Sequence, residues 1–308
     1  MKTNQEWKRQ GTELRPGITL TGKWHKRRYT IKRKLGAGAI GSVYLCDVDG
    51  QPAALKISDK GTSLTVEVNV LKALKKVQAR RLGPSLLDVD DWVAPNGLTY
   101  SFYVMEYLQG ETIPSFLRKH GSEWTGVFML QLLEDLEQLH QSGWVFGDLK
   151  LENLLVVRAP SSVRWVDVGG TTKIGRAIKE YTEFYDRGYW GMGTRRAEAS
   201  YDLFAFVMVF LNVYYPNRFE KGPQPEKTLF KKLNDAKALA PYHASLKKAL
   251  LGKYQSSAEM KREITSSLYT VQKRSRSKRK PSKVPFFIET GGISIIALTY
   301  YLFSLLLQ

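Results

Sequence analysis

The chain contains 308 residues, of which 43% are hydrophobic, and it carries a formal net charge of +18 at pH 7. This length suffices for one large domain or two small ones, and the hydrophobic content argues for a globular body. A charge this far from zero suggests an anionic partner: nucleic acid, an acidic membrane surface or a phosphorylated ligand. The single cysteine excludes an internal disulfide and fits a reducing cytosol, and the four histidines show no metal-ligand spacing.

The first part of the chain is expected to form a small β-rich lobe. Residues 1–28 are polar and basic, so we expect a loosely docked arm and not a secretory signal peptide. Residues 29–45 are predicted to form two strands around a glycine-rich turn, and residues 52–57 and 101–107 are predicted to form further strands. Between these strands, apolar residues at helical spacing predict a helix over 65–77.

The second part of the chain is expected to form a larger, mostly helical lobe. The strongest helix is predicted over 128–140, where leucines recur near one face. Residues 201–215 are so apolar that their helix should be buried on all sides. A β-rich segment followed by a helical one places the chain in the α+β class.

A glycine-rich turn lies in the first predicted hairpin. The segment from Gly36 to Val43 has the sequence GAGAIGSV and matches the pattern G-x-G-x-x-G-x-V, with glycines at Gly36, Gly38 and Gly41. Glycines let a backbone approach phosphate oxygens without a Cβ in the way. A dinucleotide-binding site would open a helix after the third glycine, whereas this chain continues as a strand.

A lysine interrupts the next apolar strand. Lys56 lies in the run AALKI, fifteen residues after Gly41. Burying an ammonium group is costly unless it meets an anion, which a nucleotide phosphate or a helix carboxylate would supply. Glu67 lies eleven residues further on, early in the predicted helix, and is the expected partner.

The segment FGDLKLEN at 146–153 combines three groups used in phosphoryl transfer. Asp148 can accept the proton of an attacking hydroxyl, Lys150 can balance charge on the phosphate, and the amide oxygen of Asn153 can hold a metal ion. Fourteen residues later, Asp167 precedes Val168 and a glycine, a setting suited to a carboxylate that binds Mg²⁺.

Together these motifs resemble the Hanks-type (eukaryotic-like) serine/threonine protein kinases of bacteria over roughly residues 29–265. The resemblance implies a bilobal protein-kinase fold with ATP in the cleft. It places a five-stranded N-lobe with one main helix at about 29–108 and an α-helical C-lobe at about 109–270. Spore-forming bacteria contain membrane-anchored members without an extracellular sensor domain, and the chain resembles these in particular.

The resemblance implies ATP and Mg²⁺ as cofactors, with Mn²⁺ as an alternative, and proteins with Ser or Thr as substrates. Asp148 would be the catalytic base, with Lys150 near the γ-phosphate, and Asn153 and Asp167 would be the metal ligands. The implied ATP-binding set is Gly36, Gly38, Gly41, Val43, Ala54, Lys56, Glu67, Met105, Glu106 and Leu108. In this set Met105 is the gatekeeper, and residues 106–108 form the hinge that receives adenine. Asp202 resembles the aspartate that steadies the catalytic loop.

The chain departs from the family pattern at several positions. Phe146 and Gly147 stand where the family has His-Arg, so we expect no control by an arginine that pairs with a phosphate on the activation loop. Val168 replaces a phenylalanine, and no Ala-Pro-Glu is found; residues 181–187 stand at that place, which puts substrate docking there in doubt. Candidate autophosphorylation sites are Thr171, Thr172, Thr182 and Thr194.

The C-terminal region is predicted to be a membrane anchor preceded by a basic linker. Residues 290–307 carry no charge, so we expect a transmembrane helix over 285–307, with a buried C-terminal helix as the alternative. Residues 271–284 are expected to form a solvated linker. Its polyanion-binding candidates are Lys273, Arg274, Arg276, Lys278, Arg279, Lys280 and Lys283. Positive residues mark the inner face, which predicts a single-pass protein of the cell membrane with its kinase domain in the cytoplasm.

Two ligands compete for this basic tract. Anionic lipid would be attracted to it electrostatically, and so would the backbone of duplex DNA. An orientation signal for membrane insertion needs fewer charges than the tract contains. Because no extracellular domain is expected after the anchor, a regulatory signal should arrive from the cytosolic side, and a polyanion on the tract is one candidate.

Two other functions remain as alternatives. The Gly147-Asp148 pair resembles the His-Gly-Asp of aminoglycoside- and choline-type small-molecule kinases, although Lys150 and the glycine-rich turn favour a protein kinase. The chain could also be a pseudokinase scaffold that binds membrane and DNA. The presence of Lys56, Asp148 and both metal-ligand candidates argues against that function.

Overall fold

The computed structural model describes residues 13–38, 41–75, 82–158 and 160–278. The chain divides into two compact units, residues 1–265 and residues 266–308. The first unit holds all the strands and helices named below except the end of the last helix. In the second unit the described residues, 266–278, form that helical end.

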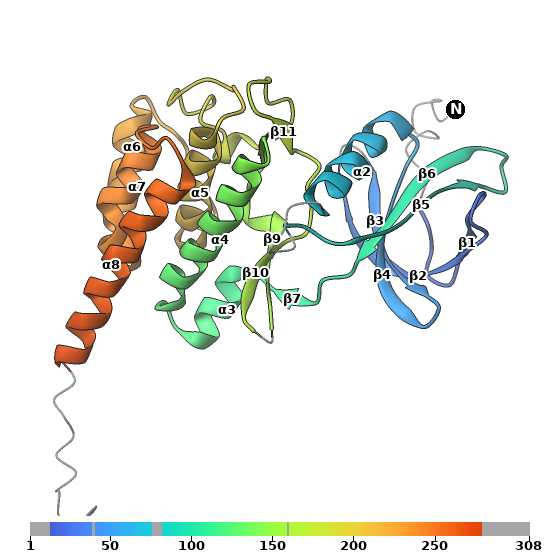
Figure 1. Cartoon of the computed structure of the whole chain (residues 1–308), viewed down its shortest axis with the longest axis horizontal. Helices are drawn as coiled ribbons and strands as arrows, with labels where there is room; N and C mark the ends of the chain where they lie inside the picture. Colours follow the sequence, from blue (N-terminus) through green and yellow to red (C-terminus); the bar gives the residue numbers. More distant parts are fainter. Residues whose placement is uncertain (1–12, 39–40, 76–81, 159, 279–308) are drawn as a thin grey trace, which may run out of the picture. The chain divides into compact units, whose positions relative to one another are not determined.

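The N-lobe is built on an antiparallel sheet of six strands in the order β1-β2-β3-β4-β6-β5 (Figure 1). The strands are β1 (Thr19–Thr21), β2 (Arg28–Ala37), β3 (Ser42–Val48), β4 (Gln51–Ser58), β5 (Leu86–Val93) and β6 (Thr99–Glu106). One helix, α2 (Gly61–Lys75), packs against this sheet through contacts with β5 and β6. Aromatic and β-branched side chains such as Tyr29, Ile31 and Phe102 fill the core, as alternation along half-buried strands requires.

The expectation of a loosely docked arm over 1–28 is wrong for its described part. Strand β1 pairs with β2, and the turn after it is fixed to β5 at the other edge of the sheet. The backbone N–H groups of Trp24 and His25 donate to the buried carboxylate of Asp90, at 2.9 and 2.8 Å. Lys23 N donates to the carbonyl of Asp91 at 2.7 Å. Because β1 adds a strand, the N-lobe has six strands where the family resemblance implied five.

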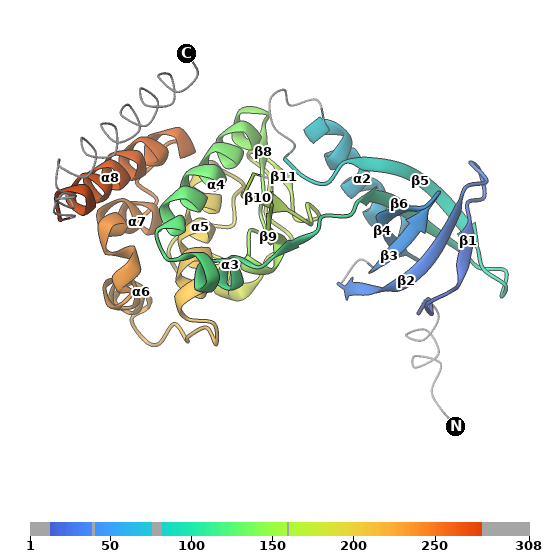
Figure 2. The same cartoon turned by 90° about the horizontal axis from the view of Figure 1, so that it is seen from below.

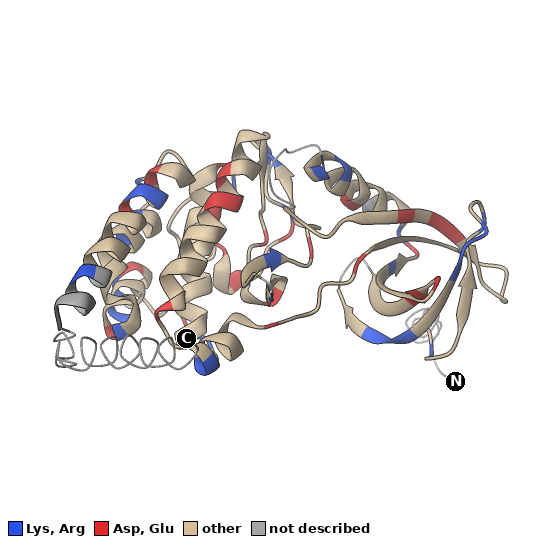
Figure 3. Cartoon of the chain, turned by 60° about the horizontal axis from the view of Figure 1, so that its bottom comes forward, with Lys and Arg blue, Asp and Glu red and all other residues tan. Residues whose placement is uncertain are grey.

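This docking also changes the electrostatic role of the N-terminal basic residues. Acidic positions of β5 lie beside the basic turn between β1 and β2 (Figure 3). Arg27 pairs with Asp49 at 2.8 Å, and His25 lies 2.7 Å from Asp88. Part of the positive charge of the N-terminal region is therefore compensated within the lobe.

The C-lobe consists mainly of helices, with short strands near the N-lobe (Figure 2). Its helices are α3 (Ile113–His120), α4 (Trp124–Gln141), α5 (Ala199–Tyr214), α6 (Pro225–Asp235), α7 (His243–Leu250) and α8 (Ser257–Lys278). Its strands are β7 (Gly110–Glu111), β8 (Trp144–Val145), β9 (Leu154–Val157), β10 (Ser162–Trp165) and β11 (Thr172–Lys173). The short helices are η1 (Leu151–Asn153), η2 (Glu183–Tyr185) and η3 (Lys237–Tyr242). Residues 201–212 of α5 are all buried, in keeping with a sequence that is apolar except for Asp202 and Asn212.

The predicted linker over 271–284 is wrong for its first residues, which continue α8 as far as Lys278. Lysine and arginine are good helix formers, and the chain has neither glycine nor proline before Pro281 in this stretch. None of the described helices combines the length and the hydropathy that a bilayer-spanning segment needs. The predicted transmembrane segment, 285–307, lies outside the described residues, as does the linker from 279 onward.

Candidate active site

A cavity of about 520 Å³ collects residues from both lobes. It is lined by twelve of the residues predicted from the sequence: Gly36, Gly38, Gly41, Val43, Ala54, Lys56, Met105, Glu106, Leu108, Lys150, Asn153 and Asp167. Glu67 and Asp148 lie next to this lining, each in contact with a lysine that belongs to it. Residues from five separate segments of the chain are thus brought together around one space large enough for a nucleotide.

The glycine-rich turn covers one side of this cavity, between β2 and β3. Gly38 N donates to the carbonyl of Gly41 at 2.9 Å. A Cβ at Gly41 would lie 2.3 Å from the carbonyl oxygen of Ile57, so only glycine lets this turn approach β4 so closely. A Cβ at Gly36 or Gly38 would meet no described atom within 4 Å.

Lys56 on β4 and Glu67 on α2 form a buried ion pair. Lys56 Nζ lies 2.7 Å from Glu67 Oε2 and 3.7 Å from Asp167 Oδ2. The hydroxyl of Tyr103 donates to Glu67 at 2.8 Å. Burial raises the pKa of Glu67 above its ordinary value, and the charge of Lys56 offsets only part of that shift. The pair fixes the ammonium group at the wall of the cavity.

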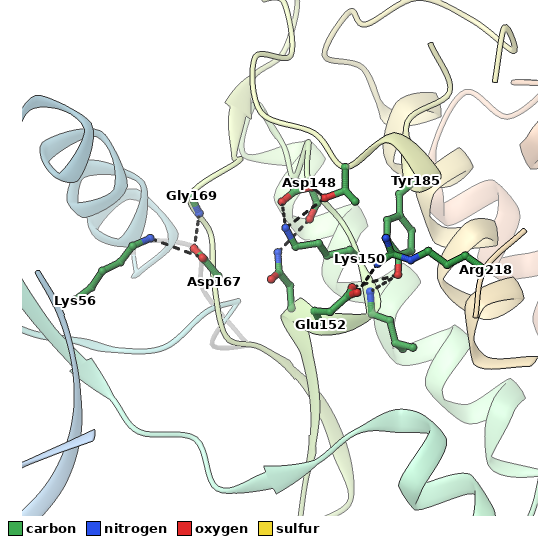
Figure 4. Close-up of polar contacts among 11 residues, drawn as sticks. Lys56, Asp148, Lys150, Glu152, Asp167, Gly169, Tyr185 and Arg218 are labelled. Carbon is green, nitrogen blue, oxygen red and sulfur yellow. Dashed lines mark hydrogen bonds and ion pairs between the residues drawn. The ribbon is translucent and has the colours of Figure 1, made fainter. Parts of the chain in front are cut away.

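Asp148 is held by three side chains (Figure 4). Lys150 Nζ contacts its Oδ2, and the hydroxyl of Thr182 donates to its Oδ1 at 3.0 Å. Asn153 Nδ2 donates to the Asp148 carbonyl oxygen at 3.1 Å, so this bond uses the amide nitrogen and not the amide oxygen. The carboxylate is thereby oriented, while the Asn153 oxygen stays available to a cation.

Asp167 follows β10 and belongs to the segment DVGG. Its Oδ1 accepts a hydrogen bond from Gly169 N at 2.9 Å, and its side chain is 43% exposed. Asp167 and Asn153 both line the cavity and offer the oxygen atoms that hard divalent cations prefer. In the part of the chain that the structure describes, no group of three His, Cys, Asp or Glu side chains could hold a metal. The oxygen donors of Asn153 and Asp167 fit a cation whose other ligands would come from phosphate and water.

The backbone of the catalytic segment is held by the buried carboxylate of Asp202 on α5. This carboxylate accepts hydrogen bonds from the backbone N–H groups of Phe146, at 2.7 Å, and Gly147, at 3.0 Å. His140 Nε2 lies 2.9 Å from the same carboxylate. The ring of Phe146 is fully buried and packs edge-on against Trp165, with centroids 4.8 Å apart. Asp202 therefore contacts the backbone immediately before Asp148.

The segment that replaces Ala-Pro-Glu is fixed by a buried carboxylate. Asp186 accepts hydrogen bonds from the hydroxyl of Tyr201 at 2.9 Å and from Tyr189 N at 2.8 Å. Arg195 pairs with it at 2.8 Å. Neighbouring Arg187 pairs with Glu198 at 2.6 Å. Residues 186 and 187 are thus anchored by ion pairs with residues 195 and 198, a few positions further along the chain.

Several residues at the site were not predicted from the sequence. The apolar cavity lining includes Leu155 and Val166, which belong to strand-like runs whose buried face could have indicated them. Thr182 was identified only as a candidate phosphorylation site, yet its hydroxyl donates a hydrogen bond to Asp148. Thr171, another such candidate, is buried. Glu152 contacts Arg218 and the hydroxyl of Tyr185, as Figure 4 shows, and no local signal predicts that contact.

Four of the seven polyanion-binding candidates lie among the described residues. Lys273 is exposed on α8, and Arg274, Arg276 and Lys278 continue the same helix. Arg279, Lys280 and Lys283 lie outside the described residues.

Comparisons with known proteins agree with this geometry. The model of the protein kinase domain family matches residues 29–281. The serine/threonine-protein kinase YabT of Bacillus subtilis is 50% identical over 252 residues, which cover 82% of this chain and 75% of that protein. Protein kinase PINOID 2 of Arabidopsis thaliana is 33% identical over 141 residues, which cover 42% of this chain and only 26% of that protein.

A solved structure gives the same fold. Vaccinia related kinase 3 aligns with a TM-score of 0.62 at 18% identity, covering 87% of this chain and 95% of that one. The predictions of a bilobal α+β kinase fold and of serine/threonine kinase chemistry are confirmed, and the family implies ATP, a divalent metal ion and protein substrates. The chain belongs to the protein kinase family and is a serine/threonine protein kinase.

Proposed function

We propose that this kinase uses ATP with Mg²⁺, or Mn²⁺ as an alternative, to phosphorylate Ser or Thr in proteins and in its own chain. The observation that carries the proposal is the convergence of Lys56, Lys150, Asn153 and Asp167 on one cavity, with Asp148 held beside it. Each group is of the type that phosphoryl transfer requires, and each is oriented by a second protein group.

The residues of the site have separate tasks. Lys56, held by Glu67, neutralises charge on the α- and β-phosphates, and Lys150 neutralises charge near the γ-phosphate. Asp148 accepts the proton of the substrate hydroxyl as its oxygen bonds to the γ-phosphorus, while the bond from that phosphorus to the bridging oxygen breaks and ADP leaves. Asn153 and Asp167 would hold the divalent ion, which when bound draws charge from the phosphate oxygens. Adenine would lie between Val43 and Ala54 on one side and Leu155 on the other, against residues 106–108.

Radiolabel transfer from ATP tests the assignment. Asp148→Ala and Lys56→Ala should each lower autophosphorylation and labelling of a basic protein by at least about a hundredfold. Asp235→Ala, which removes an exposed carboxylate of α6, is the control and should transfer phosphate at the wild-type rate. Undiminished transfer in either active-site variant would contradict the catalytic roles of Asp148 and Lys56. Small aminols in the same assay should remain unlabelled, because the comparisons point to protein substrates.

Membrane tethering is the second part of the proposal. It is supported by the uncharged run 290–307 and by the basic tract before it, because about 20 apolar residues span a bilayer as a helix. The kinase domain and tract would then face the cytoplasm. The full chain should sediment with membranes and resist extraction by high salt, and a chain truncated after residue 284 should be released. Recovery of the full chain in the soluble fraction would contradict the anchor.

Regulation by a polyanion is the third part. Seven cations in residues 273–283 can neutralise phosphates of DNA or of anionic lipid. The described cations of this tract, up to Lys278, lie on α8, and the first turn of α8 contacts α4: Ala258 N donates to Glu137 at 2.7 Å, and Ser257 lies 3.1 Å from His140, which contacts Asp202. Duplex DNA and acidic liposomes should be added separately to kinase assays of the wild type and of a variant with the tract neutralised. Equal rates in all arms would contradict this regulation.

A further inference from the structure

One arginine outside the predicted site joins the two lobes beside the cavity. Arg164 lies on β10 of the C-lobe, and its Nη2 donates to Glu106 Oε2 at 3.2 Å and to the carbonyl of Gly83 at 3.1 Å. Glu106 ends β6, and Gly83 lies in the segment that enters β5; both strands belong to the N-lobe (Figure 1). A single guanidinium therefore ties a strand of one lobe to two segments of the other.

The carboxylate that receives Arg164 is itself fixed. Glu106 Oε2 also accepts a hydrogen bond from Ser85 N at 3.1 Å, and Glu106 N donates to the carbonyl of Ser85 at 2.8 Å. Burial alone would raise the pKa of Glu106, but the Ser85 N–H and the Arg164 charge hold it below its ordinary value. Glu106 is thus ionised and held by main chain on one side and by Arg164 on the other.

The segment bonded by Arg164 also contacts the metal-binding region. A Cβ built on Gly83 would lie 3.2 Å from Val168 Cγ1 and 3.7 Å from Leu71 Cδ2. Val168 follows Asp167, and Leu71 lies one turn after Glu67 on α2. The backbone around Gly83 is therefore packed between the segment that carries Asp167 and helix α2, which carries Glu67.

Stability alone does not explain an arginine at this position. The Arg164 side chain is 18% exposed, and its Nε is buried without a hydrogen-bond partner among the described residues. A buried donor without a partner is costly, whereas an apolar side chain at this position of β10 would bury no unused donor. Within the described ranges, the side-chain hydrogen bonds of Arg164 lead to Glu106 and to the segment before β5.

We propose that Arg164 is a positioning residue that sets the affinity for ATP by holding Glu106 and the hinge at residues 106–108. Glu106 and Leu108 line the cavity, so a shift of their backbone changes the surface offered to adenine. The guanidinium bonds Glu106 and the Gly83 carbonyl, whereas Gly83 packs on Val168 and Leu71 through apolar contacts that do not use Arg164. The transfer step at saturating ATP should therefore be little affected. The inference rests on the proposed role of residues 106–108 as the adenine-binding segment.

The test compares variants on both sides of the contact. Arg164→Met keeps an unbranched side chain but removes the hydrogen-bond donors. Arg164→Lys keeps the positive charge, and Glu106→Gln removes the negative charge of the acceptor. Arg158→Met, which breaks the exposed ion pair with Glu111, is the matched control. Michaelis constants for ATP and for a protein substrate, kcat at saturating ATP, direct binding of an ATP analogue and thermal unfolding should be measured for each.

Arg164→Met and Glu106→Gln should each raise the KM for ATP by about five- to tenfold, with kcat changed by less than about twofold. Arg164→Lys should recover part of the affinity, and the double variant should be no worse than either single variant, because both remove one contact. The proposal would be overturned by unchanged KM values for ATP, or by effects of the two substitutions that multiply in the double variant. A parallel loss of kcat and Tm would overturn it as well. If Asp148→Ala remained active, by contrast, the proposed catalytic roles would fail while this result still stood.

Discussion

Gly147 and Gly170 approach each other so closely that Gly147 has no room for a side chain. A Cβ on Gly147 would lie 2.4 Å from the carbonyl oxygen of Gly170, and the φ of Gly147 is 80°. A Cβ on Gly170 would lie 2.7 Å from the Cβ of Asp148. The catalytic segment and the segment after Asp167 thus pack backbone against backbone. The arginine that usually precedes the catalytic base could not be accommodated at this position, which supports control by a route other than a phosphate on the activation segment.

We therefore expect Gly147→Ala to reduce kcat by at least about tenfold, because the clash must move Asp148 or the segment that carries Asp167. The comparison is Gly175→Ala, whose φ is a similar 86° but whose Cβ would meet nothing within 4 Å. Both variants carry the backbone strain of a left-handed residue, which costs about 1–2 kcal/mol of unfolding free energy. Steady-state kinetics should show the loss only for Gly147→Ala, and equal activity in the two would contradict the steric argument.

Thr182 is expected to orient the catalytic base through its hydroxyl and not to serve as a phosphorylation site. It donates to Asp148 Oδ1 at 3.0 Å and lies 3.4 Å from Lys150 Nζ. Thr182→Val keeps the shape but removes the hydroxyl, and it should lower kcat by about tenfold, the effect of losing one hydrogen bond to a charged group. Thr182→Ser should retain most activity.

The control for this variant is Thr194→Val, at an exposed threonine whose backbone carbonyl, not its side chain, accepts the bond from Arg187. It should leave kcat unchanged. Mass spectrometry of the autophosphorylated wild type should find no phosphate on Thr182. A phosphorylated Thr182 together with full activity of Thr182→Val would show that the contact with Asp148 is dispensable.

The features that could be predicted from the sequence depend on local patterns. The glycine-rich turn lies between β2 and β3 because its flanks alternate as strands, and α5 is buried because nearly every residue of it is apolar. Lys56 was found because a lysine within an apolar strand needs an anion, and Glu67 followed from its place on the next helix.

The features that were missed depend on contacts between distant parts of the chain. Strand β5 contains three aspartates among its apolar residues, and aspartate is unfavourable in strands. The burial of Asp90 depends on N–H donors from the turn around Trp24, 66 residues earlier, as well as on the N–H of its neighbour Asp91. Thr182 and Arg164 act through partners 34 and 58 residues away. A single sequence contains no periodicity or spacing that reports such pairings.

The ion pair of Lys56 and Glu67 predicts an acid limit to activity. Because burial raises the pKa of Glu67, the folded chain binds its proton more tightly than the unfolded chain does. The stability contributed by this group is therefore full below its ordinary pKa and is lost as pH rises through the raised value. Activity has the opposite dependence, because only the carboxylate can hold Lys56. Activity should accordingly fall with decreasing pH at a value above the ordinary 4.5 of a glutamate.

The pH dependence of kcat should be measured for the wild type and for Glu67→Gln. The kcat of the variant should be lower by about ten- to a hundredfold. It should also lack the decrease of kcat at low pH that is assigned to protonation of Glu67. Glu111→Gln is the control: hydrogen bonds from Lys119 and Arg158 lower the pKa of Glu111 to about 2, so its removal should leave the profile unchanged. An acid step that persists in Glu67→Gln would have to be assigned to another group.

Gly22 should matter for stability and not for catalysis. A Cβ at this position would lie 2.3 Å from Asp90 Oδ2, the carboxylate that holds the turn between β1 and β2 against β5. Gly22→Ala should therefore reduce the free energy of unfolding by about 1–3 kcal/mol, which for a domain of this size lowers Tm by about 2–12 °C. The values of kcat and KM should stay within about twofold of the wild type, because this turn does not line the cavity. The decisive comparison is made in the background of Asp90→Ala, where the carboxylate is absent. If the clash is the cause, Gly22→Ala should cost much less stability there, and an equal cost in both backgrounds would assign the effect to the backbone of residue 22 itself.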